Sequence, residues 1–151
     1  KSTLKTLIAL AVCLSAFSSF SAKPALVFTP TEIVAITILA EARGEDKAGM
    51  YAVGCVITQR SIDRKISAHK VCTQKWQFSC WNQNDPQRNK LGRLLTLPAA
   101  KYALFLAKNL TRLDRSYVGF ANHYHTHAVS PYWSKGKTPV KIIKGHRFFR
   151  L

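Results

Sequence analysis

The stretch TPTEIVAITILAEARG, from Thr29 to Gly44, decides how the chain begins to fold. The pair Pro30–Thr31 is typical of a helix start, Glu32 follows in the first turn, and Gly44 is a stop signal. Many of the apolar residues between these signals are β-branched, which in isolation favours strands. A run of this length with these end signals nevertheless predicts a helix over residues 31–43.

A second helix is predicted over residues 45–63, EDKAGMYAVGCVITQRSID. Acidic residues come first, where they complement the positive end of a helix, and Arg60 lies near the other end. Apolar residues recur at mixed spacings of three and four, which predicts that most of this helix is buried. They are Met50, Tyr51, Val53, Val56 and Ile57.

The remaining sequence predicts a long loop, a third helix and a small sheet. Residues 64–93 lose the helical periodicity and form a loop with one short strand at residues 77–80; a loop of this length is usually functional. The third helix lies within residues 97–113, and the aromatic, β-branched tail predicts antiparallel strands with a turn at Lys144 and Gly145. The fold class is α+β, with about three helices packed against a small antiparallel sheet.

The N-terminal segment has the layout of a secretory signal peptide, with Lys1 and Lys5 ahead of an apolar block and then small residues. We expect cleavage after Ser21, so that residues 1–21 are removed; a membrane anchor is the alternative. The formal charge then falls from +16 to +14. For a secreted or periplasmic protein, such a charge attracts anionic envelope polymers rather than nucleic acid, or simply keeps the protein soluble.

Three cysteines follow the predicted signal peptide. In an oxidising compartment Cys72 and Cys80, which flank a short loop, are expected to form a disulfide. Cys55 lies in the apolar sequence AVGCVI and is expected to be a buried free thiol, without the partner base that a nucleophile needs.

Acid chemistry can draw on only seven carboxylates. Three of them stand at predicted helix starts, where capping is their expected role: Glu32, Glu45 and Asp46. Glu41 lies instead in the last turn of the first helix, whose negative end favours the protonated carboxyl. With apolar neighbours it can hold a proton near neutral pH, as a general acid requires. The alternative is a structural Glu41 that pairs with Arg43 or Arg60.

Five motifs occur in order along the chain: LAEARGE, AVGCVITQR, VCTQKWQFSCWNQND, ANHYHTHAVSPYW and GHRFFR. Together, over residues 33–150, they resemble the SleB-type cell wall hydrolases, the spore-cortex-lytic family of peptidoglycan lytic enzymes. The resemblance implies a catalytic domain over residues 30–151, related to lysozymes and lytic transglycosylases. It also implies action on peptidoglycan glycan strands. We expect a monomer that uses no cofactor.

The resemblance assigns roles to both glutamates of the EARGE sequence. The catalytic residue of the family falls on Glu41, and Glu45 is interpreted as support. Glu41 then protonates the oxygen between N-acetylmuramic acid and N-acetylglucosamine, and accepts the proton of the muramoyl 6-hydroxyl to give a 1,6-anhydro product. An ordinary glycosidase needs a second carboxylate, for which Glu45 and Asp85 are the candidates.

Five aromatic residues of the loop and the tail offer flat faces and hydrogen-bonding tips to a glycan: Phe78, Trp81, Tyr124, Tyr132 and Trp133. The substrate-binding candidates are Trp81, Tyr124, Phe78 and Asn122. Core packing is the favoured interpretation of Phe78 and of Trp133, whereas Trp81 and Tyr124 are as well explained by a groove as by a core.

Histidines alternate along the tail. His123, His125 and His127 share one face of a strand and, with His146, could ligate zinc. The resemblance covers His123 without requiring the others as metal ligands, and His123 without a metal is expected to support the site through a hydrogen bond to substrate or to Glu41. Two other functions stay open: a zinc-dependent peptidoglycan amidase, and a non-enzymatic basic protein that binds anionic envelope polymers or nucleic acid.

Overall fold

The first predicted helix is present as α1 (Pro30–Ala42) in a computed structural model that describes residues 27–151. Thr29 caps it: the Thr29 hydroxyl accepts a hydrogen bond from the Glu32 N–H, and the Glu32 carboxylate accepts one from the Thr29 N–H at 2.8 Å. The predicted capping role of Glu32 is therefore confirmed. The predicted signal peptide, residues 1–21, lies outside the described residues.

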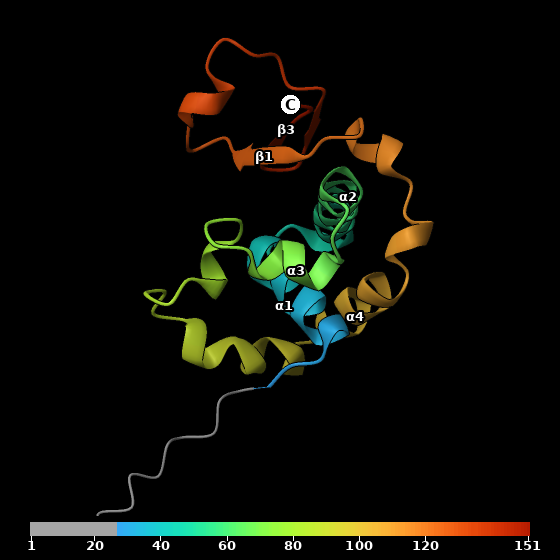
Figure 1. Cartoon of the computed structure of the whole chain (residues 1–151), viewed down its shortest axis with the longest axis vertical. Coiled ribbons are helices and arrows are strands. Elements are labelled where there is room, and N and C mark those ends of the chain that lie inside the picture. The colour runs from blue at the N-terminus through green and yellow to red at the C-terminus, as the bar shows by residue number, and fades with distance from the viewer. Residues whose placement is uncertain (1–26) are drawn as a thin grey trace, which may run out of the picture.

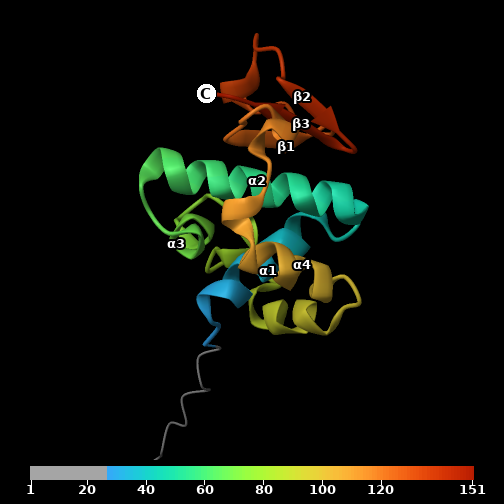
Figure 2. The same ribbon diagram turned by 90° about the vertical axis from the view of Figure 1, so that its right-hand side faces the viewer.

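Helix α2 (Asp46–Arg64) crosses the middle of the molecule, with the sheet on one side and α1, α3 and α4 on the other (Figure 1, Figure 2). Val53 and Ile57 belong to the main core, which α2 shares with α1. Val56 packs with Phe148 in a second cluster beneath the sheet. Because α2 is apolar on both sides it must be covered on both, and it therefore joins the helical layer to the sheet.

The segment after α2 contains α3 (Ala68–Thr73) and the 3-10 helices η1 (Ser79–Trp81) and η2 (Arg88–Thr96). The strand predicted at residues 77–80 is wrong. Local turns use the hydrogen-bonding groups that a strand would pair: the Gln77 N–H donates to the Gln74 carbonyl, and the Trp81 N–H donates to the Phe78 carbonyl. Both α3 and η2 contact α1, so this segment wraps around the first helix.

Helix α4 (Ala100–Lys108) is shorter than the predicted range of 97–113. The chain leaves the helix at Asn109, whose side chain donates a hydrogen bond to the Phe105 carbonyl at 2.8 Å. The 3-10 helices η3 (Leu110–Arg112) and η4 (Arg115–Val118) then lead to the sheet. Helix α4 packs closely on α1 and so completes the helical layer.

The tail forms the predicted antiparallel sheet, in the order β1-β3-β2. Its strands are β1 (His123–Thr126), β2 (Lys141–Ile143) and β3 (His146–Phe149), and η5 (Tyr132–Ser134) lies between β1 and β2. Tyr124 pairs with Phe148 across β1 and β3. The turn between β2 and β3 is at Lys144 and Gly145 as predicted, with Lys144 at a φ of 52°. Helices packed on an antiparallel sheet confirm the α+β class.

The predicted disulfide is not formed: Cys72 and Cys80 are free thiols in the structure. Both lie in the main core, and burial raises the pKa of each to about 12, which keeps them protonated. The prediction depended on their sequence spacing, which does not show that both side chains face the core. Cys55 is a buried free thiol, as expected, and burial raises its pKa to about 12.

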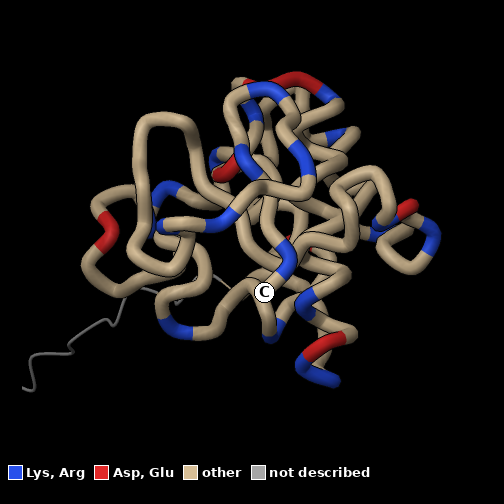
Figure 3. Tube along the Cα trace, turned by 90° about the horizontal axis from the view of Figure 1, so that it is seen from above, with Lys and Arg blue, Asp and Glu red and all other residues tan. Residues whose placement is uncertain are grey.

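Basic residues outnumber acidic ones, 23 to 7, and Figure 3 shows Lys and Arg spread over many parts of the trace rather than along one strip. The charge is therefore a property of the whole surface. Within residues 27–151, no helix combines the length and the apolar character needed to cross a membrane.

Candidate active site

Glu41 lies in the last turn of α1, where the chain bends through Arg43 and Gly44 into α2. Its side chain is half-buried and lines a cavity of about 230 Å³ between this bend and the loop after α3. The other residues of the wall are Ala40, Arg43, Ser79, Cys80, Asp85, Gln87, Lys90, Leu91 and Leu94. The carboxyl group is therefore neither sealed in the core nor directed into open solvent.

Tyr124 holds the Glu41 carboxyl group from the sheet side. Its hydroxyl donates a hydrogen bond to Glu41 Oε2 at 2.7 Å. The Tyr124 ring contacts the rings of His146 and Phe148, at centroid distances of 5.0 and 5.6 Å. Burial raises the pKa of Tyr124 well above its ordinary value, and the neighbouring Glu41 raises it further, so Tyr124 remains a hydrogen-bond donor. Tyr124 thus orients the acid from the sheet.

Burial also raises the pKa of Glu41, because the cavity and the core hydrate a carboxylate poorly. The Tyr124 hydrogen bond and the charges of His146 and Arg60 lower that pKa, but burial has the larger effect. Among the described residues Glu41 has no salt-bridge partner, so neither of the predicted alternative pairs, with Arg43 or with Arg60, is formed. A carboxyl group in this setting retains its proton to higher pH than an ordinary glutamate and can donate it.

Arg60 supplies a buried positive charge beneath the site. Its Nε donates a hydrogen bond to the Asn122 carbonyl at 2.6 Å, and its guanidinium lies 5.2 Å from the centre of the Phe78 ring. Its Nη1 is buried and has no hydrogen-bond partner among the described residues. Burial lowers the pKa of Arg60 while Tyr124 and Glu41 raise it, and an arginine stays charged. Arg60 can therefore stabilise the carboxylate that Glu41 becomes after it has donated its proton.

Glu45 stands at the start of α2 and is bound differently. Its Oε2 lies 2.6 Å from Nδ1 of the buried His146. Two glycines leave room for it: a Cβ on Gly49 would lie 2.5 Å from the Glu45 Cβ, and a Cβ on Gly145 would lie 2.7 Å from Glu45 Oε1. Glu45 makes no side-chain cap bond and instead links the start of α2 to the turn between β2 and β3.

Asp46 takes the expected capping role, with its Oδ1 accepting the Ala48 N–H at 2.8 Å.

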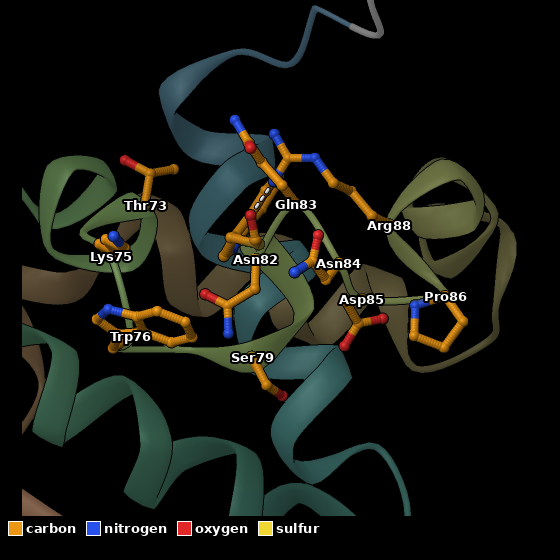
Figure 4. Close-up of a pocket in the computed structure, with 11 residues that line it drawn as sticks. Thr73, Lys75, Trp76, Ser79, Asn82, Gln83, Asn84, Asp85, Pro86 and Arg88 are labelled. Atoms are coloured by element: carbon orange, nitrogen blue, oxygen red, sulfur yellow. Dashed lines mark hydrogen bonds between the residues drawn. The ribbon is translucent and has the colours of Figure 1, made fainter.

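A larger pocket of about 800 Å³ opens beside the Glu41 cavity and shares two wall residues with it, Ser79 and Asp85. Trp81 lines this pocket and is fixed by a hydrogen bond from its indole N–H to the Thr37 hydroxyl at 2.8 Å. Figure 4 shows the amide side chains of the loop in the middle of the pocket, between Trp76 and Pro86. The two pockets therefore lie next to each other, and Glu41 lines only the smaller one.

A model of the family described as Cell Wall Hydrolase matches residues 44–149, which include Glu45, Asp85, Tyr124 and His146. The chain belongs to the cell wall hydrolase family. Its predicted relationship to the SleB-type enzymes is thereby confirmed, and peptidoglycan is the substrate of the family. The match begins just after Glu41, so the role of that residue depends on its geometry. No curated protein and no solved structure matches the chain.

The sheet of this cell wall hydrolase places Tyr124 on one face and His123 and His125 on the other. Neighbouring residues of β1 point to opposite faces, so Tyr124 faces Glu41 whereas His123 and His125 both contact Trp133, at centroid distances of 5.1 and 5.5 Å. His123 Nδ1 lies 2.8 Å from Asn122 Oδ1 and makes no hydrogen bond to Glu41. The predicted support of Glu41 by His123 is therefore not seen, and Tyr124 takes that position.

Two further substrate-binding candidates of the cell wall hydrolase have structural roles. Phe78 is only 3% exposed and packs in the main core, as the favoured interpretation expected. The Asn122 amide donates to Asp63 Oδ2 at 3.0 Å and to the Leu151 carbonyl at 2.8 Å, and thereby holds the last residue of the chain. Of the four candidates, Trp81 lines the pocket and Tyr124 contacts the acid.

The histidines of the cell wall hydrolase are not gathered as ligands. Within residues 27–151, no group of three or more His, Cys, Asp or Glu side chains is arranged to hold a metal ion. His125 stacks on Phe149 at a centroid distance of 5.2 Å, and His146 is bound to Glu45. His123 and His125 therefore serve aromatic packing on the outer face of the sheet, and His127 is exposed just after the end of β1.

Sequence reasoning missed the contribution of three residues to this site. Trp76 and Ser79 line the pockets, and the buried His146 binds Glu45 across 101 residues of sequence. No local sequence pattern identifies a contact as distant as that of Glu45 with His146. For Trp76 one signal was available: the tryptophan within QKWQ lies at a tight turn, where bulky residues are uncommon.

Proposed function

We propose that the protein is an exported peptidoglycan lytic enzyme that cleaves the glycosidic bond between N-acetylmuramic acid and N-acetylglucosamine, with Glu41 as the acid. The observation that carries this proposal is a half-buried carboxyl group with a raised pKa, held by Tyr124 at 2.7 Å and open to a cavity. General acids on glycosidic oxygens need this combination of access and retained proton.

In the proposed reaction Glu41 gives its proton to the glycosidic oxygen as the bond from that oxygen to the muramoyl C1 breaks. Positive charge develops at C1 and the ring oxygen. The carboxylate, stabilised by Tyr124 and by the charge of Arg60, then takes the proton of the muramoyl 6-hydroxyl. The oxygen of that hydroxyl group bonds to C1 at the same time. The product is a 1,6-anhydro sugar, no water is consumed, and Glu41 regains its proton.

Hydrolysis is the second candidate reaction, and the position of Asp85 in the wall of the Glu41 cavity favours it. Asp85 lines the same cavity as Glu41, and its Oδ1 accepts the Gln87 N–H at 2.7 Å. A second carboxylate there can direct a water molecule to C1, as in enzymes that use two carboxyl groups. Glu45, the other candidate, is bound to His146 and is less available. Asp85→Asn should stop cleavage in a hydrolase and leave a transglycosylase active.

Analysis of the products tests both the bond and the reaction type. The protein without residues 1–21 is incubated with purified murein sacculi, and the soluble fragments are identified by mass spectrometry. Fragments ending in 1,6-anhydro-muramic acid support the transglycosylase, and fragments with a reducing muramic acid end support the hydrolase. Intact sacculi, or cleavage confined to the peptide stems, would overturn the proposal.

Export and charge complete the proposed function. Residues 1–21 are proposed to direct secretion, and the +14 charge that remains is proposed to hold the enzyme near anionic envelope polymers. Binding of this kind should weaken steeply as salt is raised and should survive Glu41→Gln. Affinity for purified envelope polymer that does not change with salt would contradict it.

A further inference from the structure

We propose that Trp76 forms a sugar-stacking subsite of the larger pocket, which binds an N-acetylated amino sugar of the glycan strand some distance from the bond that is cleaved. This inference rests on the proposed function and adds a specificity-determining residue to it. Trp76 stands at one end of the pocket (Figure 4).

The backbone of Trp76 is in a conformation that disfavours a large side chain. Its φ is 67°, and it is the third residue of a turn closed by the hydrogen bond from the Gln77 N–H to the Gln74 carbonyl. Glycine is the residue favoured at such positions, and a bulky residue there is a true outlier. Backbone strain of this kind is concentrated at binding sites, where the position of a side chain is kept although it lowers the stability of the fold.

Packing does not explain Trp76 either. The side chain is 72% exposed, whereas Trp81 in the same loop is half-buried and hydrogen-bonded to Thr37. The Lys75 ammonium lies 5.2 Å from the centre of the Trp76 ring and helps to hold the indole in place. Trp76 therefore presents a large, oriented, apolar surface to solvent at the edge of a pocket.

The other side chains of the pocket fit an acetamido sugar. Asn82, Gln83 and Asn84 line it, and none of their amide groups is hydrogen-bonded to another described residue. Free amides can both donate to and accept from hydroxyl and acetamido groups, and an indole ring stacks on the apolar face of a sugar ring. Arg88 is fixed by its bond to the Trp81 carbonyl and adds further N–H donors for the hydroxyl and acetamido oxygens of the sugar.

The larger pocket lies next to the Glu41 cavity, so the ligand that we propose for it is the same polymer. Ser79 and Asp85 belong to both walls, so a chain of sugars that reaches Glu41 can continue over this loop toward Trp76. The subsite is therefore expected to act on long glycan strands and not on short fragments that fill only the Glu41 cavity.

The test measures binding separately from cleavage. Glycan oligosaccharides freed from their stem peptides, of two sugars and of eight, are titrated calorimetrically into Glu41→Gln. The same titration is made with Trp76→Gly added, and with Tyr132→Ala added as a matched control. Tyr132 is 88% exposed, has Lys135 over its ring at 5.8 Å, and lies outside both pockets.

Trp76→Gly should weaken binding of the longer oligosaccharide about tenfold and leave the disaccharide unchanged. Its melting temperature should be equal to or higher than that of the parent, because glycine relieves the strained backbone. Tyr132→Ala should change neither affinity. Equal affinity with and without Trp76, an equal loss in the Tyr132 control, or displacement of the glycan by free stem peptide would overturn the proposal.

The outcome also separates this inference from the proposed function. The subsite is wrong, and the proposed function stands, if two results occur together. The Trp76→Gly enzyme still cleaves sacculi to the same products, and Glu41→Gln binds the long oligosaccharide equally well with and without Trp76. A wild-type enzyme that cleaves no glycan removes the proposed function, and the binding measurement still decides the subsite.

Discussion

Glu41 and Glu45 stand on the two sides of one bend, four residues apart, and meet opposite environments. Glu41 is at the negative end of α1, accepts a hydrogen bond from a neutral tyrosine, and has no salt-bridge partner among the described residues. Glu45 is at the positive end of α2, and His146 Nδ1 lies 2.6 Å from its carboxylate. Burial at the end of α1 raises the pKa of Glu41 and favours its protonated carboxyl group, whereas Glu45 is held by a direct contact with a histidine of the sheet.

The sheet supplies the hydrogen-bond partners of both glutamates. Tyr124 of β1 contacts Glu41, His146 of β3 contacts Glu45, and the two rings touch each other at a centroid distance of 5.0 Å. One packed pair of aromatic rings thus gives adjacent glutamates different partners. Residue type and spacing thus propose an acid, whereas burial determines which carboxyl group retains its proton and Tyr124 holds that group in place.

The largest expected effect is on catalysis by the first glutamate. Glu41→Gln should reduce cleavage of sacculi by about 10²- to 10⁴-fold, because the amide has no proton to donate. Glu45→Gln is the matched control and should retain most of the activity. Release of soluble fragments measures both. Comparable losses in the two variants would erase the distinction between the glutamates.

The stability of the same variant sharpens the contrast. Because burial raises the folded-state pKa of Glu41 above 4.5, the folded protein binds more protons than the unfolded chain between 4.5 and that pKa. The free energy of unfolding of the wild type therefore falls as pH rises through this window. Glu41→Gln removes the effect, and at pH 7 it should be at least as stable as the wild type in urea. A large loss of stability would mean that Glu41 holds the fold.

Tyr124→Phe should have the next largest effect on rate, a loss of about tenfold, because the acid loses the group that orients it. The Tyr124 hydrogen bond lowers the pKa of Glu41, so its removal should raise that pKa. A general acid is active while protonated, and the decline of kcat at high pH should therefore move to higher pH. A pH–rate profile for each protein measures the shift, and movement to lower pH would contradict the assigned contact.

The second glutamate should matter more for stability than for rate. His146→Asn leaves the Glu45 carboxylate without its partner and should cost about 1 to 2 kcal/mol of unfolding free energy. In a double-mutant cycle with Glu45→Gln, the two losses should be clearly less than additive. Additive losses would show that the pair contributes nothing jointly.

Substitution of Asp63 should have the smallest effect on stability, and the pKa of Asp63 is shifted in the opposite direction to that of Glu41. The Arg150 hydrogen bond, with those from Asn122 and Gln59, lowers the pKa of Asp63 to about 2. Its stabilising effect is present above pH 3.8 and is lost as pH falls through about 2. Asp63→Asn should cost about 1 kcal/mol at pH 7, a modest value because the pair is partly exposed, and should leave kcat unchanged. Equal stability of the two proteins at pH 7 would contradict this.

The parts of the fold that sequence could predict are those with local signals. Helix α1 begins and ends within one residue of its prediction because Thr29, Pro30 and Glu32 act within a single turn. The turn at Lys144 and Gly145 was also predicted from local sequence, and it lies between β2 and β3. The strand predicted at residues 77–80 was wrong because apolar residues there serve a series of short turns, which β-propensity does not detect.

The candidate site was predictable only as far as its acid. Glu41 followed from its place at a helix end and from the family motif, but the contact with Tyr124 spans 83 residues and that of Glu45 with His146 spans 101. Such pairs depend on how β1 and β3 are placed over α2, which no local pattern contains. The same reason explains why His123 was assigned to the site although it faces the other side of the sheet.

Burial at the end of α1 keeps Glu41 protonated at pH values where ordinary glutamates have ionised. A titration of the Glu41 side-chain carboxyl carbon by ¹³C NMR, assigned with Glu41→Gln, measures this directly. We predict a midpoint above the ordinary value of 4.5. A midpoint at or below 4.5 would contradict the account, because the residue would then be a carboxylate throughout the range in which an acid is needed.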